Sequence, residues 1–415
     1  MEGKSAPRGS LLLASGQRFG TSPGLIARLF APGFRKLIAR VERGLVAGSL
    51  AAQLPDGSHR KLGGRAPGFA ADVELRDWRA LIRLATGGSI GWYQGWEAGE
   101  WTSSDPVTLF ALFAANAASL GDTARAKGPW RLAARAWHRF NRNTKVQAER
   151  NIHAHYDLGN DFYSAWLDPT MSYSSGYRFG AEGLEAAQRH KWDRLAERLG
   201  RPATLLEIGC GWGALAGHFA GRGADVTAIS LSDAQLAWAR AHQPSVQFRK
   251  QDYRDVASDA SSRFDGIVSV EMVEALGREY WPAFMDCIAR NLAPGGRAAI
   301  QFIAMRDDLF DSYARNTDFI QAYVFPGGLL IKAAEFRALA EARGLAWEDE
   351  EAFGLDYAET LKAWRARFDA AEADDRLPAG FDRRFCALWR YYLMYCEGGF
   401  RGGATTVRQV TLRRN

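Results

Sequence analysis

Residues 205–213 carry the sequence Leu205-Leu206-Glu207-Ile208-Gly209-Cys210-Gly211-Trp212-Gly213, in which a short apolar run leads into three closely spaced glycines. The run from Thr204 to Ile208 predicts a buried strand, and the stretch Leu215–Arg222 predicts a helix directly behind the glycines. Glycines at such a strand-to-helix turn let the backbone pass close to a bound ligand. The stretch therefore predicts an α/β sheet with a ligand at the end of this strand.

Short apolar runs continue to alternate with helical stretches after this point, which is typical of a doubly wound, Rossmann-like sheet. Further strands are predicted at Asp225–Ser230, Val246–Lys250, Gly266–Val270, Arg297–Phe302 and Val407–Leu412. Further helices are predicted at Asp233–His242 and Trp281–Asn291.

The glycine turn alone does not identify its ligand, because Gly209-x-Gly211-x-x-Ala214 also satisfies a relaxed dinucleotide fingerprint. Two features favour S-adenosylmethionine over a nicotinamide cofactor. Glu207 stands two residues before the first glycine, where class I methyltransferases carry an acid, and residues 229–232 hold no acid for a nicotinamide ribose. Asp252 and Tyr253 follow the third strand and supply a carboxylate and an aromatic ring suited to an adenine.

The composition of the 415-residue chain, 47% hydrophobic and 24% charged, indicates a globular protein with a large core. Its four cysteines form no CxxC pair, so the sequence predicts neither a disulfide framework, nor a zinc ribbon, nor any other metal site. The strongest apolar run, near residues 109–120, is too short for a membrane span, and the N-terminus lacks a signal-peptide pattern. These features favour a cytoplasmic protein.

Positive charge is concentrated in the first third of the chain. Residues 1–150 hold 22 Lys and Arg against 11 Asp and Glu, whereas the rest holds 31 against 36. A basic module of this kind is expected to approach a polyanion, either nucleic acid or an anionic lipid surface. The pattern predicts four parts: a flexible tail (1–24), a smaller α+β lipid-facing domain (25–121), a basic amphipathic linker helix (122–149) and the large sheet domain (150–415).

The linker segment has no acidic residue between Asp122 and Glu149 but seven basic ones, with Trp130, Trp137 and Phe140 interleaved. On a helix the aromatic and arginine side chains form neighbouring stripes, and such a helix can rest on an anionic bilayer. The alternative is an interdomain helix whose aromatic residues are core, and the sequence leaves both open. Nucleic-acid binding is not expected, since no recognisable module accompanies the charge.

Several separate motifs resemble the cyclopropane-fatty-acyl-phospholipid synthase family, which includes the mycolic acid methyltransferases. Besides the glycine turn they are Asn151–Tyr163, Met171–Ser175, Leu231–Gln235, Gln251–Asp255, Phe325–Gly328, Asp356–Leu361 and Tyr395–Arg401. The resemblance covers roughly residues 151–414 and implies a class I methyltransferase fold. It implies a peripheral enzyme at the inner membrane face that adds a carbon from S-adenosylmethionine to the double bond of an unsaturated phospholipid acyl chain, forming cyclopropane fatty acids.

The resemblance also assigns cofactor residues. Tyr173 and Ser174 are expected at the methionine part, and the segment His155-Tyr156-Asp157 is expected to cover the pocket. The other expected contacts are Glu207, Gly209, Gly211, Gly213, Ser230, Leu231, Ser232, Gln235, Asp252, Tyr253 and Arg254.

For the chemistry, the resemblance implies a bicarbonate base surrounded by a Cys, a Glu, a His and a Tyr. Glu274 and Tyr357 match two of these positions, while Ser175 stands at the cysteine position and Gln301 at the histidine position. Serine and glutamine still offer hydrogen-bond donors, but the changes leave open both bicarbonate use and ring closure. The alternatives are a methyl-branched or methylene-bearing chain and a non-catalytic lipid-binding protein.

Two further residues have two interpretations each. Cys396 matches a cysteine sometimes assigned as the active residue of the family, but it is equally a small buried residue that shapes the acyl channel. Glu271 is either a pocket acid or a polar residue at a strand end. The sequence also leaves the particular lipid open, as well as whether the chain forms a homodimer.

Overall fold

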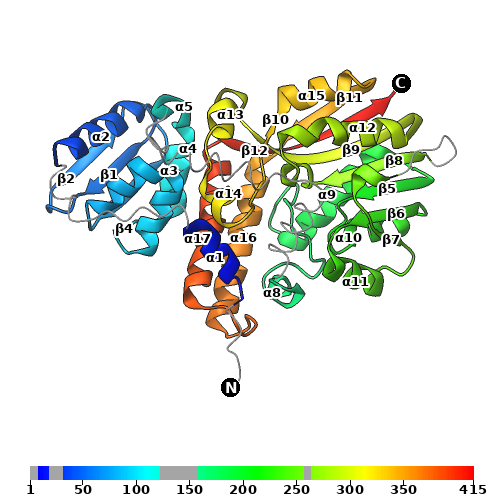
Figure 1. The fold of residues 1–415 in the computed structure, drawn as a ribbon, viewed down its shortest axis with the longest axis horizontal. Coiled ribbons are helices and arrows are strands. Elements are labelled where there is room, and N and C mark those ends of the chain that lie inside the picture. Colours follow the sequence, from blue (N-terminus) through cyan, green and yellow to red (C-terminus); the bar gives the residue numbers. More distant parts are fainter. Residues whose placement is uncertain (1–7, 18–30, 122–157, 257–262) are drawn as a thin grey trace. The chain divides into compact units, whose positions relative to one another are not determined.

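The chain divides into two compact units, whose helices and strands are labelled in Figure 1. The computed structural model describes residues 8–17, 31–121, 158–256 and 263–415. The N-terminal unit consists of Met1–Asn141, Asp308–Pro326 and Ala379–Thr405. The large-sheet unit consists of Arg142–Asp307, Gly327–Pro378 and Thr406–Asn415.

This division differs from the continuous domains expected from the sequence. The range 150–415 contains two segments, 308–326 and 379–405, that pack with the N-terminal unit. The expected boundaries at residues 24 and 149 lie outside the described residues, and so does the linker helix.

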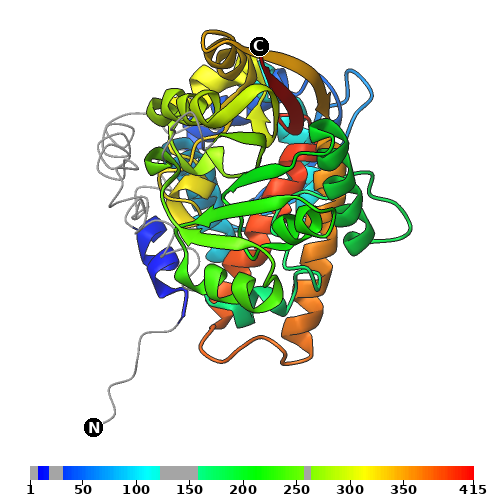
Figure 2. The same ribbon diagram turned by 90° about the vertical axis from the view of Figure 1, so that its right-hand side faces the viewer.

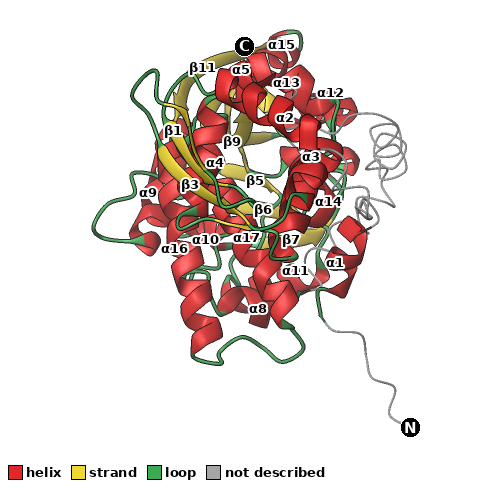
Figure 3. Cartoon of the chain, turned by 90° about the vertical axis from the view of Figure 1, so that its left-hand side faces the viewer, coloured by secondary structure: helices red, strands yellow, loops and turns green. Residues whose placement is uncertain are grey.

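A four-stranded mixed sheet forms one layer of the N-terminal unit (Figure 3), with the strand order β2-β1-β3-β4. Its strands are β1 (Ser49–Gln53), β2 (His59–Gly63), β3 (Ala70–Leu75) and β4 (Trp101–Thr102). The described helices of this unit are α1 (Ser10–Gln17), α2 (Ala31–Gly44), α3 (Arg79–Glu97), α4 (Pro106–Ala115), α5 (Ala117–Leu120), α13 (Asp307–Ala314), α14 (Phe319–Tyr323) and α17 (Arg383–Arg401).

Helix α17 joins this unit because glycines allow it to approach α4 closely. A Cβ atom at Gly398 would overlap Phe110, and one at Gly402 would overlap the carbonyl oxygen of Ala111. The Tyr391 ring packs edge-on against Phe110 and Phe319, with ring centroids 5.3 and 4.9 Å apart. An aromatic core therefore binds a late segment of the sequence to an early one.

The large-sheet unit is built on eight strands, with helices on both faces of the sheet (Figure 2). Its strands are β5 (Thr204–Ile208), β6 (Asp225–Ser230), β7 (Gln247–Lys250), β8 (Phe264–Val270), β9 (Leu292–Met305), β10 (Ile331–Lys332), β11 (Leu345–Ala352) and β12 (Thr405–Arg414). Its described helices are α8 (Asn160–Ser164), α9 (Leu184–Leu199), α10 (Ala214–Ala220), α11 (Asp233–His242), α12 (Trp281–Asn291), α15 (Ala333–Glu341), α16 (Gly354–Ala373) and the short η3 (Tyr253–Asp255), η4 (Val273–Ala275) and η5 (Arg278–Tyr280).

The strand order β11-β12-β9-β8-β5-β6-β7 fixes where a ligand can bind. Strands β7, β6, β5, β8 and β9 are parallel. The order of strand addition reverses between β5 and β8, because β6 and β7 lie on one side of β5 whereas β8 and β9 lie on the other. Ligands of open α/β sheets bind outside the carboxyl ends of the strands at such a reversal. Here that place lies after Ile208 and Val270.

The predicted α/β class is confirmed, and β5, β6, α11 and α12 have the bounds that the sequence predicted. Residues of α9, α10 and α11, including Trp192, Phe219 and Leu236, share one apolar core with the strands. In the described part of the chain, no helix combines the length and the apolar character needed to cross a membrane.

Candidate functional site

The glycine turn lies directly after β5, at the reversal of the sheet. Gly209, Gly211 and Gly213 all have φ in the left-handed region, at 83°, 52° and 85°. A Cβ atom at Gly209 would lie 2.6 Å from Cγ of Met272, so this side of the turn is packed. A Cβ atom at Gly211 would meet nothing within 4 Å. The backbone is therefore open to a ligand at Gly211.

Glu207, near the end of β5, is a buried carboxyl group that is only partly satisfied. Its side chain is almost fully buried, and no described residue donates to its Oε2 atom. Burial raises the pKa of Glu207 to about 8, although the nearby Lys191 charge opposes this shift. A buried carboxylate oxygen without a partner fits the ammonium group of an amino-acid ligand.

The loop between β6 and α11 holds further groups for a ligand. Ser232 caps α11 by accepting a 3.3 Å hydrogen bond from the backbone N–H of Gln235, and its own N–H donates to Ser230. Leu231 lies between the two serines. The Gln235 side chain is buried, and its Nε2 atom has no partner among the described residues. This amide is placed to bind a polar group of a ligand.

Arg254 lies beside Asp252 after β7, and the two side chains pair with each other. The guanidinium donates bonds of 2.6 and 2.8 Å to the Asp252 carboxylate. Tyr253 is buried against Phe284, and no described residue bonds to its hydroxyl group. The Asp252 carboxylate is therefore engaged by Arg254, while the Tyr253 hydroxyl group is a buried polar atom that a ligand could satisfy.

Tyr173 and Ser174 are held rigidly in the segment before α9. The Tyr173 ring packs against Trp364 and Trp166, with centroids 5.2 and 5.6 Å apart. Ser174 accepts a 2.5 Å hydrogen bond from the Nζ atom of Lys191. Sequence reasoning missed Lys191, which is fully buried. Burial lowers the pKa of its ammonium group to about 8, while the charges of Glu271, Asp168 and Glu207 act in the opposite direction.

The expected cofactor residues thus fit S-adenosylmethionine. The backbone is open at Gly211, and buried polar atoms of Glu207, Gln235 and Tyr253, which follow or end neighbouring strands, lack partners among the described residues. Such atoms are costly to bury unless a ligand or water satisfies them. The assignment of each contact remains a prediction.

Glu271, not Glu274, forms the centre of the expected catalytic group. Its Oε1 atom accepts hydrogen bonds from the backbone N–H of Ser175 at 2.9 Å and from Nε2 of Gln301 at 2.7 Å. Its Oε2 atom accepts from the hydroxyl group of Tyr357 at 2.7 Å. Three of the four residues that the resemblance placed around bicarbonate, Ser175, Gln301 and Tyr357, therefore bind one carboxylate.

The backbone at Glu271 is strained, which also sets this residue apart. Its φ angle is 49°, in a region that costs a side-chain-bearing residue about 1–2 kcal/mol. The N–H of Glu271 donates to the carbonyl oxygen of Gln301 at 2.9 Å, which holds this conformation at the end of β8. The turn directs the side chain to the donors of α16 and β9.

Glu274 lies one helical turn further and has a different environment. Its Oε1 atom accepts from the backbone N–H of Ile303, and its buried Oε2 atom has no partner among the described residues. Burial, together with the Glu271 charge, raises the pKa of Glu274 to about 8. At neutral pH this carboxyl group mostly keeps its proton, so Glu274 can donate a hydrogen bond but is a poor base.

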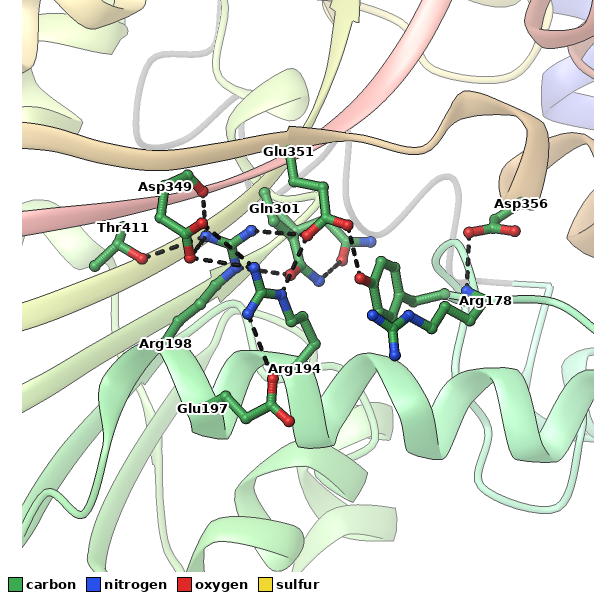
Figure 4. Close-up of polar contacts among 11 residues, drawn as sticks. Arg178, Arg194, Glu197, Arg198, Gln301, Asp349, Glu351, Asp356 and Thr411 are labelled. Carbon is green, nitrogen blue, oxygen red and sulfur yellow. Dashed lines mark hydrogen bonds and ion pairs between the residues drawn. The ribbon is translucent and has the colours of Figure 1, made fainter.

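Hydrogen bonds from Arg198 to Gln409 and from Gln409 to Gln301 orient the Gln301 side chain. Arg198 donates from Nε to Oε1 of Gln409 at 3.0 Å, and Nε2 of Gln409 donates to Oε1 of Gln301 at 2.9 Å. An arginine has no acceptor, so it fixes the direction of both amides and makes Gln301 donate to Glu271. Figure 4 shows the salt bridges that hold Arg198, with Asp349 at 2.9 Å and Glu351 at 3.3 Å.

Cys396 lies on α17 in the N-terminal unit, whereas the Glu271 group lies in the large-sheet unit. Burial and the nearby Asp318 carboxylate raise the pKa of the Cys396 thiol. A thiolate nucleophile needs a lowered pKa, so this environment favours the interpretation as a small apolar residue. None of the four cysteines forms a disulfide, and the described residues contain no cluster suited to a metal ion. The expected lid, residues 155–157, lies outside the described residues.

Comparison with protein families identifies one match over residues 143–410, to the family described as mycolic acid cyclopropane synthetase. The chain is 36% identical to the tuberculostearic acid methyltransferase UfaA1 of Mycobacterium tuberculosis over 80% of each chain. It is 33% identical to the cyclopropane-fatty-acyl-phospholipid synthase of Escherichia coli K12, over 85% of this chain and 90% of that one.

Solved structures show the same relationship. The mycolic acid cyclopropane synthase CmaA1, in complex with SAH and CTAB, matches with a TM-score of 0.59 and 27% identity. The match covers 64% of this chain and 98% of CmaA1. The comparisons confirm the resemblance that the motifs predicted and the class I methyltransferase fold.

Proposed function

Because the chain belongs to the mycolic acid cyclopropane synthetase family of S-adenosylmethionine-dependent methyltransferases, we propose that it modifies unsaturated acyl chains of membrane phospholipids. A carbon from S-adenosylmethionine is added to the double bond, and a cyclopropane ring is closed. The observation that carries the proposal is a carboxylate, Glu271, fixed by three donors at the sheet reversal that also holds the open glycine turn.

The residues of the site have separate tasks in this reaction. The turn at Gly211 and the carboxyl group of Glu207 bind the donor, whose sulfonium supplies the methyl group. An alkene is a weak nucleophile, so donor and double bond must be aligned in a dry environment. The aromatic rings around Tyr173 exclude water and can stabilise the developing positive charge by about 0.5–2 kcal/mol each.

The phospholipid substrate is expected to reach the enzyme at a bilayer surface. Residues 1–150 hold 22 basic and 11 acidic residues, and this positive charge supports attachment of the segment to anionic lipid. The enzyme is accordingly proposed to act peripherally, at the inner face of the cytoplasmic membrane.

A second candidate product is a methyl-branched or methylene-bearing chain. It is supported by the 36% identity to UfaA1, which is named as a tuberculostearic acid methyltransferase. After the carbon is added, loss of a proton from the donated methyl group closes the ring, whereas loss of a chain proton leaves an unsaturated methyl-branched chain. A methylene group forms when a hydride shift precedes loss of a methyl proton, and a saturated branch needs a reductant as well. A non-catalytic lipid-binding role is disfavoured, because such a protein would not need the buried carboxyl group of Glu207, nor the hydrogen bond from Tyr357 to Glu271 at its strained backbone.

The test is an assay with vesicles of an unsaturated phospholipid and methyl-labelled S-adenosylmethionine. We expect label in the acyl chain and a fatty acid that is one methylene unit heavier and lacks the double bond. Vesicles of a fully saturated phospholipid serve as the control and should stay unlabelled. Absence of label in the unsaturated chains, while the protein binds the donor, would overturn the proposed substrate.

A further inference from the structure

The three donors around Glu271 are already engaged by its carboxylate and are not available to the external base that the resemblance implied. A bicarbonate ion at this place would need hydrogen bonds from the segment at Ser175, from Gln301 and from Tyr357. In the structure these groups donate instead to the Glu271 carboxylate, over 2.9, 2.7 and 2.7 Å. The residues present therefore do not fit a separate bicarbonate ion.

A carboxylate and a bicarbonate ion share the chemistry that these donors recognise. Both carry a single negative charge spread over two oxygen atoms in one plane. We propose that the Glu271 carboxylate takes the place of bicarbonate and is itself the base of the reaction, an inference that rests on the function proposed above. The enzyme then needs no second ligand besides S-adenosylmethionine and the lipid.

The geometry leaves Glu271 able to accept a proton. A carboxylate offers about four lone-pair positions, and the described donors use two on Oε1 and one on Oε2. The remaining position on Oε2 can face the substrate. The amide chain from Arg198 through Gln409 keeps the donor side of Gln301 on Oε1, so the carboxylate cannot rotate freely.

Several charged groups set the proton affinity of Glu271. Burial raises its pKa above the usual value, which strengthens it as a base. The Lys191 charge from α9 and the hydrogen bonds from Tyr357, Ser175 and Gln301 oppose this shift. Glu274 on η4 faces it as well and is itself shifted by the Glu271 charge.

The proposed step balances without an oxidant or a reductant. The π electrons of the double bond form a bond to the methyl carbon while the carbon–sulfur bond breaks, and its electron pair stays on sulfur in the departing S-adenosylhomocysteine. The other alkene carbon is left positive. Oε2 of Glu271 takes one proton of the new methyl group, and the electron pair of that C–H bond closes the ring. Glu271 then returns the proton to solvent.

The first test measures bicarbonate binding and needs no activity. Carbon-13 NMR of labelled bicarbonate is recorded with the wild-type chain, with Glu271→Gly and with the control Glu182→Gln, which changes an exposed glutamate of the same unit. Glycine tolerates the positive φ at this position. We expect binding to Glu271→Gly alone, since only there do the donors become vacant. Binding to the wild type, or none to a folded Glu271→Gly, would overturn the inference.

The second test uses the vesicle assay in buffer freed of carbon dioxide. The wild-type rate should not change when bicarbonate is added, and Glu271→Gln should lose about 10²- to 10⁴-fold in kcat, as removal of a general base does. Glu271→Gly should regain activity when bicarbonate is supplied. A wild-type rate that depends on bicarbonate, or an unimpaired Glu271→Gln, contradicts the inference. A wild type that transfers no label contradicts only the proposed function, and the binding test then decides on Glu271.

Discussion

The side-chain amide of Gln409, on β12, donates a 2.9 Å hydrogen bond to Oε1 of Gln301, on β9. Both side chains are fully buried, and the far end of the chain of amides is the guanidinium of Arg198. The direction of the Gln301 amide, and with it the N–H that Gln301 donates to Glu271, is therefore set by Gln409 and Arg198.

Gln409→Met should lower both stability and turnover. Methionine fills the space but leaves the Nε donor of Arg198 and the Oε1 acceptor of Gln301 without this partner, at a cost of about 1–3 kcal/mol for each group. Urea unfolding should show an earlier transition of the large-sheet unit, and kcat should fall more than KM rises, because Gln301 loses its fixed orientation. The exposed Gln247→Met on β7 is the control. Equal stability of the two variants would contradict the role of the amide chain.

Gly211→Val should abolish binding of S-adenosylmethionine by the folded protein. Gly211 has a φ of 52° and open space at its missing Cβ, so a branched side chain both strains the turn and blocks the approach of the ligand. Calorimetry measures the binding. Gly223→Val is a matched control, because Gly223 also has a positive φ and open surroundings. Gly223 follows the C-terminal end of α10, whereas the glycine turn precedes the N-terminal end of this helix. Unchanged binding by Gly211→Val would remove the turn from the cofactor site.

Binding of S-adenosylmethionine should release a proton near neutral pH. Burial raises the pKa of Glu207 to about 8 in the ligand-free protein, so the group is mostly protonated at pH 7. A cationic ammonium beside it favours the carboxylate and lowers that pKa. Affinity should therefore rise as the pH increases towards about 8 and level off above it.

Calorimetry in two buffers with different ionisation enthalpies counts the released protons. Glu207→Gln cannot ionise, and we expect it to bind more weakly and without proton release. The pKa of Lys191 is also about 8. The same measurement on Lys191→Met therefore shows how many of the released protons come from Lys191. If Glu207→Gln released as many protons as the wild type, Glu207 would not be the ammonium contact.

Attachment to bilayers should depend on lipid charge and on salt. The basic excess lies in residues 1–150, and exposed charges are screened over about 8 Å at physiological ionic strength. Sedimentation with vesicles should show binding to anionic lipid that weakens as salt rises, and little binding to neutral lipid. Equal binding under all of these conditions would contradict an electrostatic attachment.

Local sequence patterns predicted the parts of the fold that local interactions determine. The bounds of β5, β6 and α11 were predicted because apolar runs, glycines and the serine cap act within a few residues. Strands β1 and β2 were missed, because they are short and carry small or polar residues. The place of α17 depends on contacts with α4, nearly 300 residues earlier, which no local pattern records.

The candidate site shows the same limit. The motifs pointed to Ser175, Gln301 and Tyr357, and the structure places all three on one carboxylate. That this carboxylate is Glu271 rather than Glu274 depends on a φ of 49° at a strand end. A sequence with two glutamates three positions apart gives no signal for such a turn. Arg198 and Gln409 were missed because their role exists only through neighbours on other strands.

The product should be decided by the proton that the base removes. Glutamine variants and the pH dependence of the rate show whether the base is Glu271 or Glu274, and an isotope label shows which proton is removed. Glu271 lies among three donors and carries the charge that raises the pKa of Glu274 to about 8. If Glu271 is the base, Glu271→Gln should lose far more turnover than Glu274→Gln. If Glu274 were the base, the wild-type rate would rise through pH 8, and Glu274→Gln would suffer the larger loss.

The donor is then supplied with a trideuterated methyl group, and the product fatty acids are analysed by mass spectrometry and proton NMR. Ring closure removes one deuteron from the donated methyl group, so the product retains two; a branched chain loses a chain proton and retains all three. We expect two, together with ring methylene signals far upfield in the unlabelled product, because the proposed base takes its proton from the donated methyl group. Retention of three deuterons would establish a methyl-branched product and would place Glu271 against a chain carbon instead of the donated methyl group. Two deuterons with vinyl signals in place of ring methylene signals would establish the methylene product.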